Sequence, residues 1–587
     1  MKNQVKVSDF IAKFLSKKTK HVFVGQGGSV VHLLDSINKT KDLKNISSQN
    51  EQGSAIAADA YARISGKIGV AIATSGPGII NLLQGIGCAY YDSTPTFFIS
   101  GAVTTSAMKD RKIIRQSGFQ QMDVVKMLEP ITKYAKLITD CNEIKYELEK
   151  CVYIAKSGRP GPVLLDIPDD IQRAYINPKK IRSFVPLKIK NTLVDRNKKF
   201  KSLKNLILKS LRPLVIVGNG VNLSNTKGEV LSFLRKSKIP FCPTWATVDI
   251  FSDYKLKDQN VGIFGVAATR YGNFTVQNSD LIICLGTRLN TQLTGSIPSS
   301  FAPKAKRVVI DIDQAEFKKT NNLKIDLKFN CDLKFFMPLL NKISMKDFSI
   351  SQDWIKKIKF WKKKYPIIKD EYYSQTNYVN PYIFMNKLSE KTLNNDIIIP
   401  DASANLIWTY QGYEFKKKQR MFTALNHSPM GYSVAAAIGA NLADIKSNVI
   451  AIIGDGSLPM NIQELQTIYD LNLPIKIFVI NNNGYGLIKQ TQEVWLKANY
   501  VGVDPGSGLG LPDFKKVAKS YGINSIKINN HNDLDEKLDL VLNSKKTILC
   551  ELMVDPFQRV IPKLEFGKSI DELSPLLSKE ENLKNRL

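Results

Sequence analysis

The sequence predicts an α/β protein with three doubly wound domains, each with a parallel sheet covered by helices. Its 587 residues exceed the roughly 250–300 residues that one hydrophobic core supports, which indicates several domains. Short apolar runs alternate with helical patterns, and this alternation is typical of parallel strands joined by crossover helices. We expect domains at residues 1–180, 195–345 and 375–560, followed by a polar, peripheral tail at 561–587.

Each predicted domain has its own strands and helices. The first contains strands at 21–24, 68–74 and 163–167 and a helix at 51–64. The second repeats one strand pattern at 214–218, 281–286 and 307–313. The third contains strands at 448–453 and 474–482 with a helical segment at 461–471 between them. The charged, aromatic stretch at 346–378 is either a linker helix or the start of the third domain.

The composition excludes several classes of protein. With 43% hydrophobic and 23% charged residues, the chain is neither disordered nor collagen-like, and its seven cysteines contain no CxxC pair. No run approaches the ~18 apolar residues of a membrane helix, and the first residues do not form an apolar signal segment. We therefore expect a cytoplasmic protein in a reducing compartment, without a membrane partner.

The net charge of +30 raises the question of a nucleic-acid partner. The lysines are scattered over every segment, and basic and aromatic residues do not interleave as they do in recognition modules. We interpret the charge as a compositional bias of the source organism and expect no nucleic-acid partner. An attraction for anionic substrates stays open.

The most informative stretch is a βαβ unit in the third domain. One strand ends in Gly454-Asp455-Gly456-Ser457, and the next ends in Asn481-Asn482-Asn483. Because both strand ends lie at the same edge of a parallel sheet, Asp455 and Asn482 can converge on one point. Carboxylate and amide oxygens suit Mg²⁺, which also takes oxygens from a phosphate. Gly456 would let a diphosphate approach the backbone, Ser457 would donate to it, and the helix near Asn461 adds a positive dipole end.

This pattern resembles the signature of thiamine-diphosphate enzymes, a GDG followed after about two dozen residues by NN. The resemblance implies that Asp455 and Asn482 bind Mg²⁺, with the carbonyl of Gly484 as a further ligand, and that Gly454, Gly456 and Ser457 contact the cofactor. Upstream, Met430 matches the apolar residue that bends the cofactor. Its backbone and the carbonyl of Ser428 would hold the aminopyrimidine ring.

Thiamine chemistry also needs a carboxylate at the pyrimidine ring, and Glu51, at a predicted helix start, is a candidate. Taken alone, such a glutamate equally well complements a helix dipole. The run from Glu51-Gln52-Gly53 to Pro95, with Gly27-Gly28 before it and Gly158-Arg159-Pro160-Gly161-Pro162 after it, resembles the pyrimidine-binding domain of acetolactate synthases. The resemblance implies that Glu51 activates the cofactor, that Gly27 and Gly28 contact it, and that Gln120, beside Phe119, faces the substrate. Lys133 matches a lysine of the same region.

In that family the two ends of the chain belong to active sites shared between subunits, which implies a homodimer or a homotetramer. The family also carries FAD across its central domain. By resemblance, the FAD contacts are Arg159, Gly218, Gly220, Arg288 and Asp311. Two segments depart from the family, because Gly262-Ile263-Phe264-Gly265 lacks its histidine and Arg288-Leu289-Asn290-Thr291 lacks its acidic pair. A central domain that binds no cofactor is therefore the alternative.

The acceptor side departs further, because Thr491 stands where branched-chain acetolactate synthases have a tryptophan. We expect a thiamine-diphosphate enzyme that decarboxylates pyruvate and joins the product to a second 2-keto acid. The alternative, suggested by a resemblance to relatives in surface-polysaccharide biosynthesis, is transfer of the two-carbon unit to a keto-sugar nucleotide. A non-catalytic subunit is a third hypothesis, against which the intact Glu51, Asp455 and Asn482 argue. The need for a regulatory subunit stays open.

Overall fold

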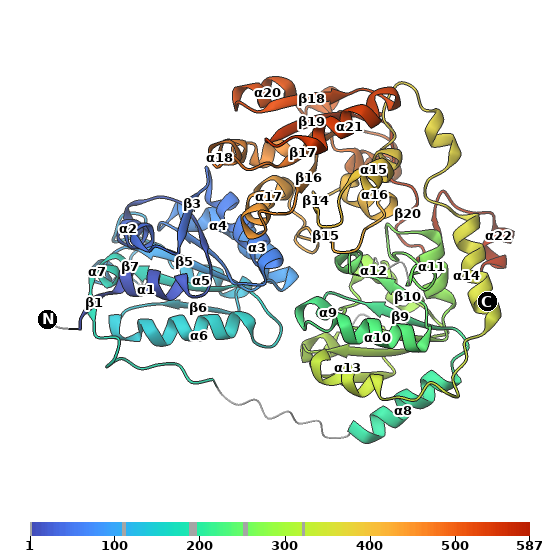
Figure 1. Ribbon diagram of the computed structural model, residues 1–587, viewed down its shortest axis with the longest axis horizontal. Helices are drawn as coiled ribbons and strands as arrows, with labels where there is room; N and C mark the ends of the chain where they lie inside the picture. The colour runs from blue at the N-terminus through green and yellow to red at the C-terminus, as the bar shows by residue number, and fades with distance from the viewer. Residues whose placement is uncertain (1–2, 109–112, 187–195, 251–255, 320–322) are drawn as a thin grey trace.

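The computed structural model describes residues 3–108, 113–186, 196–250, 256–319 and 323–587. It confirms the predicted fold class, since three parallel sheets follow one another along the chain. Figure 1 shows the N-terminal unit at the left, the C-terminal unit at the upper right and the central unit below it. Most of the predicted junction at residues 181–194 lies outside the described residues. In the ranges given above, no helix combines the length and apolar character needed to cross a bilayer.

The N-terminal unit is a six-stranded parallel sheet in the order β3-β2-β4-β5-β7-β6. Its strands are β2 (His21–Val24), β3 (Lys44–Ser47), β4 (Gly69–Ala73), β5 (Thr96–Ala102), β6 (Tyr134–Leu137) and β7 (Val163–Pro168). Side chains alternate between the two faces, so that Val22 and Val24 pack on one side and Phe23 on the other. One face carries α1 (Val7–Ser16), α2 (Val31–Lys39) and α6 (Ile144–Lys156); the other carries α3 (Glu51–Ser65), α4 (Pro77–Asp92) and α5 (Val124–Leu128). A small antiparallel ladder joins β1 (Val5–Lys6) to β8 (Tyr175–Ile176).

The central unit is a five-stranded parallel sheet in the order β10-β9-β11-β12-β13. Its strands are β9 (Pro213–Val217), β10 (Phe241–Pro243), β11 (Leu281–Leu285), β12 (Lys306–Asp311) and β13 (Leu327–Asn330). The helices α8 (Arg196–Lys209), α10 (Lys227–Ser237) and α13 (Leu333–Asn341) cover one face, and α11 (Arg270–Asn278) and α14 (Gln352–Lys364) cover the other. The stretch left open as a linker or the start of the third domain thus forms α14, whose Trp354, Ile358 and Trp361 pack into the central core.

The C-terminal unit is a six-stranded parallel sheet in the order β15-β14-β16-β17-β19-β18. Its strands are β14 (Ile397–Pro400), β15 (Arg420–Met421), β16 (Val449–Gly454), β17 (Lys476–Asn481), β18 (Asn524–Ile528) and β19 (Ile548–Met553). One face carries α17 (Tyr432–Ala443), α18 (Glu464–Asp470) and α20 (Phe514–Ser520); the other carries α15 (Pro381–Lys391), α16 (Ala404–Gly412) and α21 (Leu534–Asn543). The helix α19 (Gly486–Trp495) follows the loop after β17.

The first and third units share one hydrophobic core, in which α3 packs directly on α17 (Figure 1). Small residues make this close approach possible. A Cβ placed on Gly439 of α17 would lie only 2.0 Å from the carbonyl oxygen of Ala57 in α3. The helix that begins at Glu51 is therefore held against the helix that follows Met430 in sequence.

The expectation of a peripheral tail is wrong. Residues 563–587 contain β20 (Lys563–Leu564), β21 (Leu573–Ser574) and α22 (Lys579–Lys584) and return to the central unit, with the C-terminus beside α14 (Figure 1). Ile570 and Leu573 are fully buried. The Asn585 amide accepts from the Trp361 indole at 2.8 Å and donates to the Tyr365 hydroxyl at 2.8 Å. Polar composition did not reveal this, because the segment is anchored by a few buried contacts.

Candidate functional site

The structure brings Asp455 and Asn482 to neighbouring strand ends. Asp455 follows β16 and Asn482 follows β17, and these strands are paired so that Gly454 lies opposite Ile480. The Asp455 carboxylate accepts from the N–H groups of Gly456 at 2.7 Å and Gly484 at 2.9 Å, so it fixes the loop that holds Asn482. The asparagine motif and the aspartate therefore form one unit at the carboxyl edge of the sheet, as expected for parallel strands.

The donor set fits Mg²⁺ and a diphosphate. Asp455 is buried, and this burial raises the pKa of its carboxyl to about 6, although hydrogen bonds from Gly484 and Gly456 oppose the rise. The carboxylate is therefore mostly ionised at neutral pH and able to bind a cation. The Nδ2 group of Asn482 is buried without a hydrogen-bond partner among the described residues. An unsatisfied amide N–H beside a buried carboxylate suits the oxygens of a bound phosphate.

The glycines of this motif have different local roles. A Cβ on Gly456 would lie 2.2 Å from the ring of Tyr485, so this glycine makes room for a neighbouring aromatic side chain. Gly454 is less crowded, with the Asn405 side-chain oxygen 3.4 Å from its Cβ position. Ser457 is buried and donates its N–H to the Gly454 carbonyl at 3.0 Å. In this chain Gly456 is therefore required by packing within the protein.

The loop before α17 presents Met430. Ser428 is exposed and has a left-handed backbone, with φ of 52°, and Met430 is half-buried. The following turn is fixed by Asp401, whose carboxylate accepts from the N–H groups of Gly431 at 3.1 Å and Ser433 at 2.8 Å. Burial raises the pKa of Asp401 to about 6. The sequence analysis did not identify Asp401. This residue directly follows β14, so the strand-end argument that identified Asp455 applies to it as well.

Glu51 begins α3, after Asn50, whose side chain caps the helix by accepting from the Gln52 N–H at 2.8 Å. The Glu51 carboxylate accepts from Asn81 Nδ2 at 2.9 Å. Gly25 leaves room for it, because a Cβ there would lie 2.2 Å from Glu51 Cγ. Among the described residues, the hydrogen bonds of the Glu51 carboxylate thus come from the N-terminal unit, and those of Asp455 come from the C-terminal unit.

Gly27 and Gly28 lie in the turn after β2, close to the end of β4. A Cβ on Gly27 would lie 2.3 Å from Thr74, whereas Gly28 has open space around its Cβ position. Gln120 lies at the same edge, because it contacts Gly76 at the start of α4. A Cβ added to Gly76 would lie 2.9 Å from Gln120 Cβ. Gln120 has a left-handed backbone with φ of 60°, and Phe119 beside it is 85% exposed. The structure therefore brings Gly27, Gly28 and Gln120 to the carboxyl edge of the N-terminal sheet.

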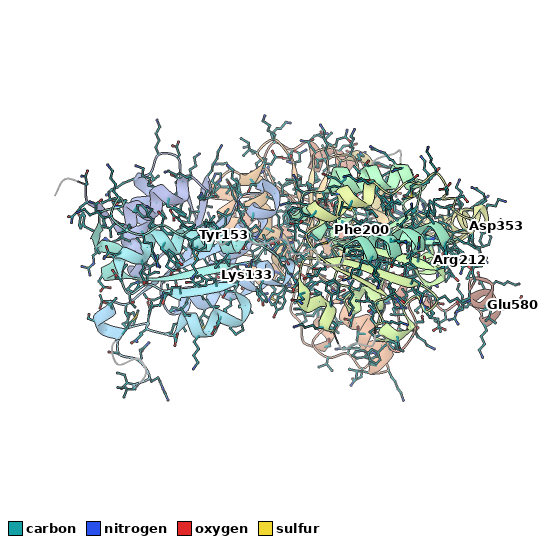
Figure 2. The ribbon with its side chains drawn as sticks, turned by 90° about the horizontal axis from the view of Figure 1, so that it is seen from below. Lys133, Tyr153, Phe200, Arg212, Asp353 and Glu580 are labelled. Carbon is teal, nitrogen blue, oxygen red and sulfur yellow. The ribbon has the colours of Figure 1, made fainter. Side chains whose placement is uncertain are left out.

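Lys133 lies elsewhere in this unit. Its ammonium donates to the carbonyls of Ile154 and Ser157, the latter at 2.7 Å, and so caps the C-terminal end of α6. Figure 2 labels Lys133 beside Tyr153, a residue of that helix. Burial lowers the pKa of Lys133 to about 8. The observed contacts give Lys133 a structural role at the end of a helix.

The residues expected to hold FAD are largely occupied within the protein. Arg159 pairs with Asp313 at 3.0 Å and with Glu316 at 3.2 Å. Gly218 and Gly220 both pack against Gly286. A Cβ on Gly218 would lie 2.3 Å from the Gly286 carbonyl oxygen, and a Cβ on Gly220 would lie 2.7 Å from the Gly286 Cα.

Burial shifts the pKa of two further residues that were expected to contact FAD, Asp311 and Arg288. Burial raises the pKa of Asp311, and burial with the neighbouring Arg159 lowers the pKa of Arg288. The Arg288 guanidinium has no ion-pair partner within the part of the chain described, although the nearby carboxylates of Glu316, Asp92 and Asp311 partly offset the lowering of its pKa. Arg159, Gly218 and Gly220 thus make their described contacts within the protein.

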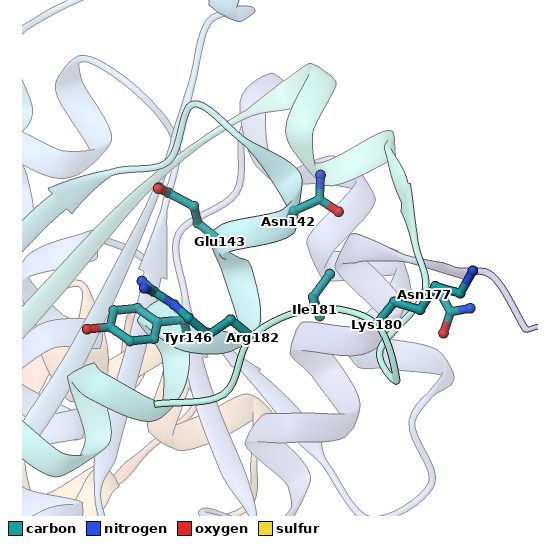
Figure 3. Close-up of a pocket in the computed structure, with 7 residues that line it drawn as sticks. All are labelled: Asn142, Glu143, Tyr146, Asn177, Lys180, Ile181 and Arg182. Carbon is teal, nitrogen blue, oxygen red and sulfur yellow. The ribbon is translucent and has the colours of Figure 1, made fainter. Parts of the chain in front are cut away.

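A separate cavity of about 520 Å³ lies in the N-terminal unit. Figure 3 shows its lining residues: Asn142, Glu143, Tyr146, Asn177, Lys180, Ile181 and Arg182. The Arg182 guanidinium lies over the Tyr146 ring, 3.9 Å from its centroid. The cavity contains none of the predicted site residues, so it adds nothing to the candidate site.

Comparison with known proteins places these sites in context. Residues 5–127, 200–340 and 401–552 match the families described as "Thiamine pyrophosphate enzyme", N-terminal TPP binding domain, central domain and C-terminal TPP binding domain, respectively. The chain is 31% identical to the acetolactate synthase large subunit of Cyanidium caldarium, over 98% of this chain and 97% of the relative. It is 32% identical to a probable acetolactate synthase large subunit of Methanocaldococcus jannaschii, over 99% and 97%. Identity to acetolactate synthase 1, chloroplastic, of Zea mays is 30%, over 97% and 88%.

Proposed function

Because the chain belongs to the thiamine pyrophosphate enzyme family, we propose that it decarboxylates pyruvate and joins the two-carbon product to a second 2-keto acid. The cofactor is thiamine diphosphate, another name for thiamine pyrophosphate, with Mg²⁺ as its metal. The observation that supports this proposal most strongly is the position of Asp455 and Asn482 directly after the adjacent, paired strands β16 and β17. The full-length similarity to acetolactate synthases supports the choice of reaction.

Each residue of the site has a distinct task in this proposal. Asp455 and Asn482 hold Mg²⁺, and Asp401 fixes the turn that presents Met430. Thiamine diphosphate, when bound, supplies the electron sink for decarboxylation and carbon–carbon bond formation. Glu51 would hold and release the proton for the aminopyrimidine ring at Oε1, because Asn81 already donates to Oε2.

We also propose that the active site lies between two copies of this chain. The contacts of Glu51 and Asp455 belong to separate units, and the loop beside Gln120 exposes large apolar side chains. Phe119 is 85% exposed and Ile113 is 83% exposed, as expected for a surface that a second subunit covers. This arrangement predicts complementation between E51Q and D455A. Each homodimer would be inactive, whereas a random mixture of the two chains would recover about a quarter of the wild-type activity through its heterodimers.

The reaction is tested by measuring CO₂ release from pyruvate with thiamine diphosphate and Mg²⁺, together with product identification by mass. Acetolactate from pyruvate alone is the expected result, and E51Q should bind the cofactor but lose at least about a hundredfold in kcat. Unchanged turnover in E51Q would refute the role of Glu51. Turnover only with an added keto-sugar nucleotide would instead support the alternative acceptor, for which Thr491 on α19 is the motivating residue.

FAD stays outside this mechanism, because most of its expected contacts are engaged elsewhere. A flavin site is tested at Arg288, which has no ion-pair partner among the described residues. Purified protein should show no stoichiometric flavin absorbance and should need no added FAD for turnover. Stoichiometric flavin that is lost in R288A would contradict this expectation.

A further inference from the structure

The N-terminal end of α3 is held from the opposite unit by Glu464. This glutamate begins α18 and is fully buried. Its carboxylate accepts from the backbone N–H groups of Asn50 at 3.0 Å and, more weakly, Gln49 at 3.4 Å. These are the two residues directly before Glu51. The contact therefore joins the C-terminal unit to the backbone that carries the proposed catalytic glutamate.

The surroundings of Glu464 restrict it to this position. Thr467 donates its hydroxyl to Glu464 Oε2 at 2.8 Å. On the other side, a Cβ on Gly53 would lie 2.4 Å from Glu464 Oε1, so the first turn of α3 accommodates the carboxylate only because residue 53 is glycine. A second link runs beside it, from Gln52 Nε2 to Asn461 Oδ1 at 3.3 Å.

Glu51 is thus fixed from two directions. Asn81 of the N-terminal unit holds its side chain, and Glu464 of the C-terminal unit holds the backbone before it. The helix N-terminus would otherwise have free N–H groups, which a buried carboxylate satisfies with charge-assisted bonds. A neutral amide at position 464 would turn an N–H donor toward one of these backbone donors. The start of α3 would then move.

We propose that Glu464 is a positioning residue, which sets the place of Glu51 for cofactor activation without itself touching cofactor or substrate. The proposal rests on the proposed function, because it assumes that Glu51 exchanges a proton with the cofactor. A misplacement of about 1 Å costs on the order of a hundredfold in rate, so E464Q should lower kcat about tenfold to a hundredfold. The affinity for thiamine diphosphate and the KM for pyruvate should change less than threefold, because Asp455 and Asn482 are untouched.

A double-mutant cycle separates this role from general stability. The readout is the rate at which the bound cofactor exchanges its C2 proton with deuterated water, measured by NMR after acid quenching. E464Q should slow this exchange in the wild-type background and have no further effect in the E51Q background, since both changes act through one group. If E51Q exchanges at the wild-type rate, the proposed function fails. If E51Q is slow and E464Q is normal, only the present proposal fails.

Asp249 provides the matched control. It is also a buried carboxylate that accepts a backbone N–H from another unit, that of Met421 at 3.0 Å. D249N should lower thermal stability and leave the C2 exchange rate unchanged. T467V is the milder second variant, because it removes only the hydroxyl that anchors Glu464. If D249N slowed the C2 exchange as much as E464Q does, the effect of E464Q would be one of general stability, and Glu464 would have only a structural role.

Tagged heterodimers decide which site Glu464 serves. In a dimer of D455A and E51Q chains, the working site uses Glu51 from the first chain and Asp455 from the second. E464Q placed on the D455A chain should abolish most of the recovered activity, and E464Q on the E51Q chain should spare it. The reverse pattern would overturn the proposal, because it would mean that Glu464 supports the cofactor-binding unit. Absence of activity in the parent heterodimer would instead refute the shared active site.

Discussion

Replacement of Gly439 by alanine should separate the two helices on which the site depends. A new Cβ would lie 2.0 Å from the Ala57 carbonyl oxygen, whereas real Cβ atoms essentially never come closer than 3.0 Å. The obstructing atoms belong to the backbone of α3, so no side-chain rotation removes the clash. The helices α3 and α17 must therefore move apart by about 1 Å.

The cost follows from two opposing effects. Alanine is favoured over glycine inside a helix by about 1 kcal/mol. Overpacking of a close-packed core costs about 1–3 kcal/mol, and a backbone clash belongs at the upper end of this range. The expected net loss for G439A is about 2 kcal/mol. Activity should fall further, because the same movement displaces Glu51 from its position relative to the C-terminal unit.

Gly228 is the matched control, since it lies in helix α10 and has nothing within 4 Å of its Cβ position. G228A should raise the stability by about 0.5–1 kcal/mol through helix propensity alone. Thermal unfolding and kcat are measured for both variants. A G439A protein that melts at or above the wild-type temperature with normal kcat would refute the close contact between α3 and α17.

Three further predictions concern groups outside this contact. N585A should cost about 1–3 kcal/mol, because it leaves the buried Trp361 indole N–H without its partner, and the loss is measured by thermal unfolding. K133M should lower the stability by about 1 kcal/mol, because Lys133 caps α6, and should change the KM for pyruvate less than twofold. A large change in KM would indicate that Lys133 contacts the substrate. The raised pKa of Asp401, about 6 against an ordinary 3.8, means that the folded state binds the extra proton. The free energy of unfolding should therefore fall by roughly 1 kcal/mol from pH 5 to pH 7 through this group, and denaturant titrations of D401N should lack that component.

The sequence was most informative where chemistry and periodicity coincide. Asp455 and Asn482 follow apolar strands that pair in parallel, so strand-end geometry alone was enough to bring them together. The strand at 21–24 and the helix that begins at Glu51 were predicted from the same kind of local pattern. Such features depend on a few consecutive residues, and this is why they could be predicted.

Long-range contacts could not be predicted in this way. Glu464 meets Gln49 and Asn50 across more than 400 residues, and nothing in its own segment distinguishes it from a helix-capping acid. The burial of the tail depends on single partners such as Asn585 and Trp361. The packing at Gly456 could not be predicted either, because the ring of Tyr485 that occupies its Cβ position comes from a later loop.

These long-range contacts also explain how α3 is placed. Its first turn is held by Glu464, and its middle packs on Gly439. At its last turn, Arg63 pairs with Asp59 at 2.8 Å, and Tyr432 of α17 donates to the same carboxylate at 2.6 Å.

Buried ion pairs of this kind contribute little net stability, but they discriminate strongly against a shifted arrangement, because a broken pair leaves an uncompensated charge. Three separate contacts along one helix fix its axial position and its rotation. The location of Glu51 is therefore determined as much by the C-terminal unit of its own chain as by the N-terminal unit to which α3 belongs.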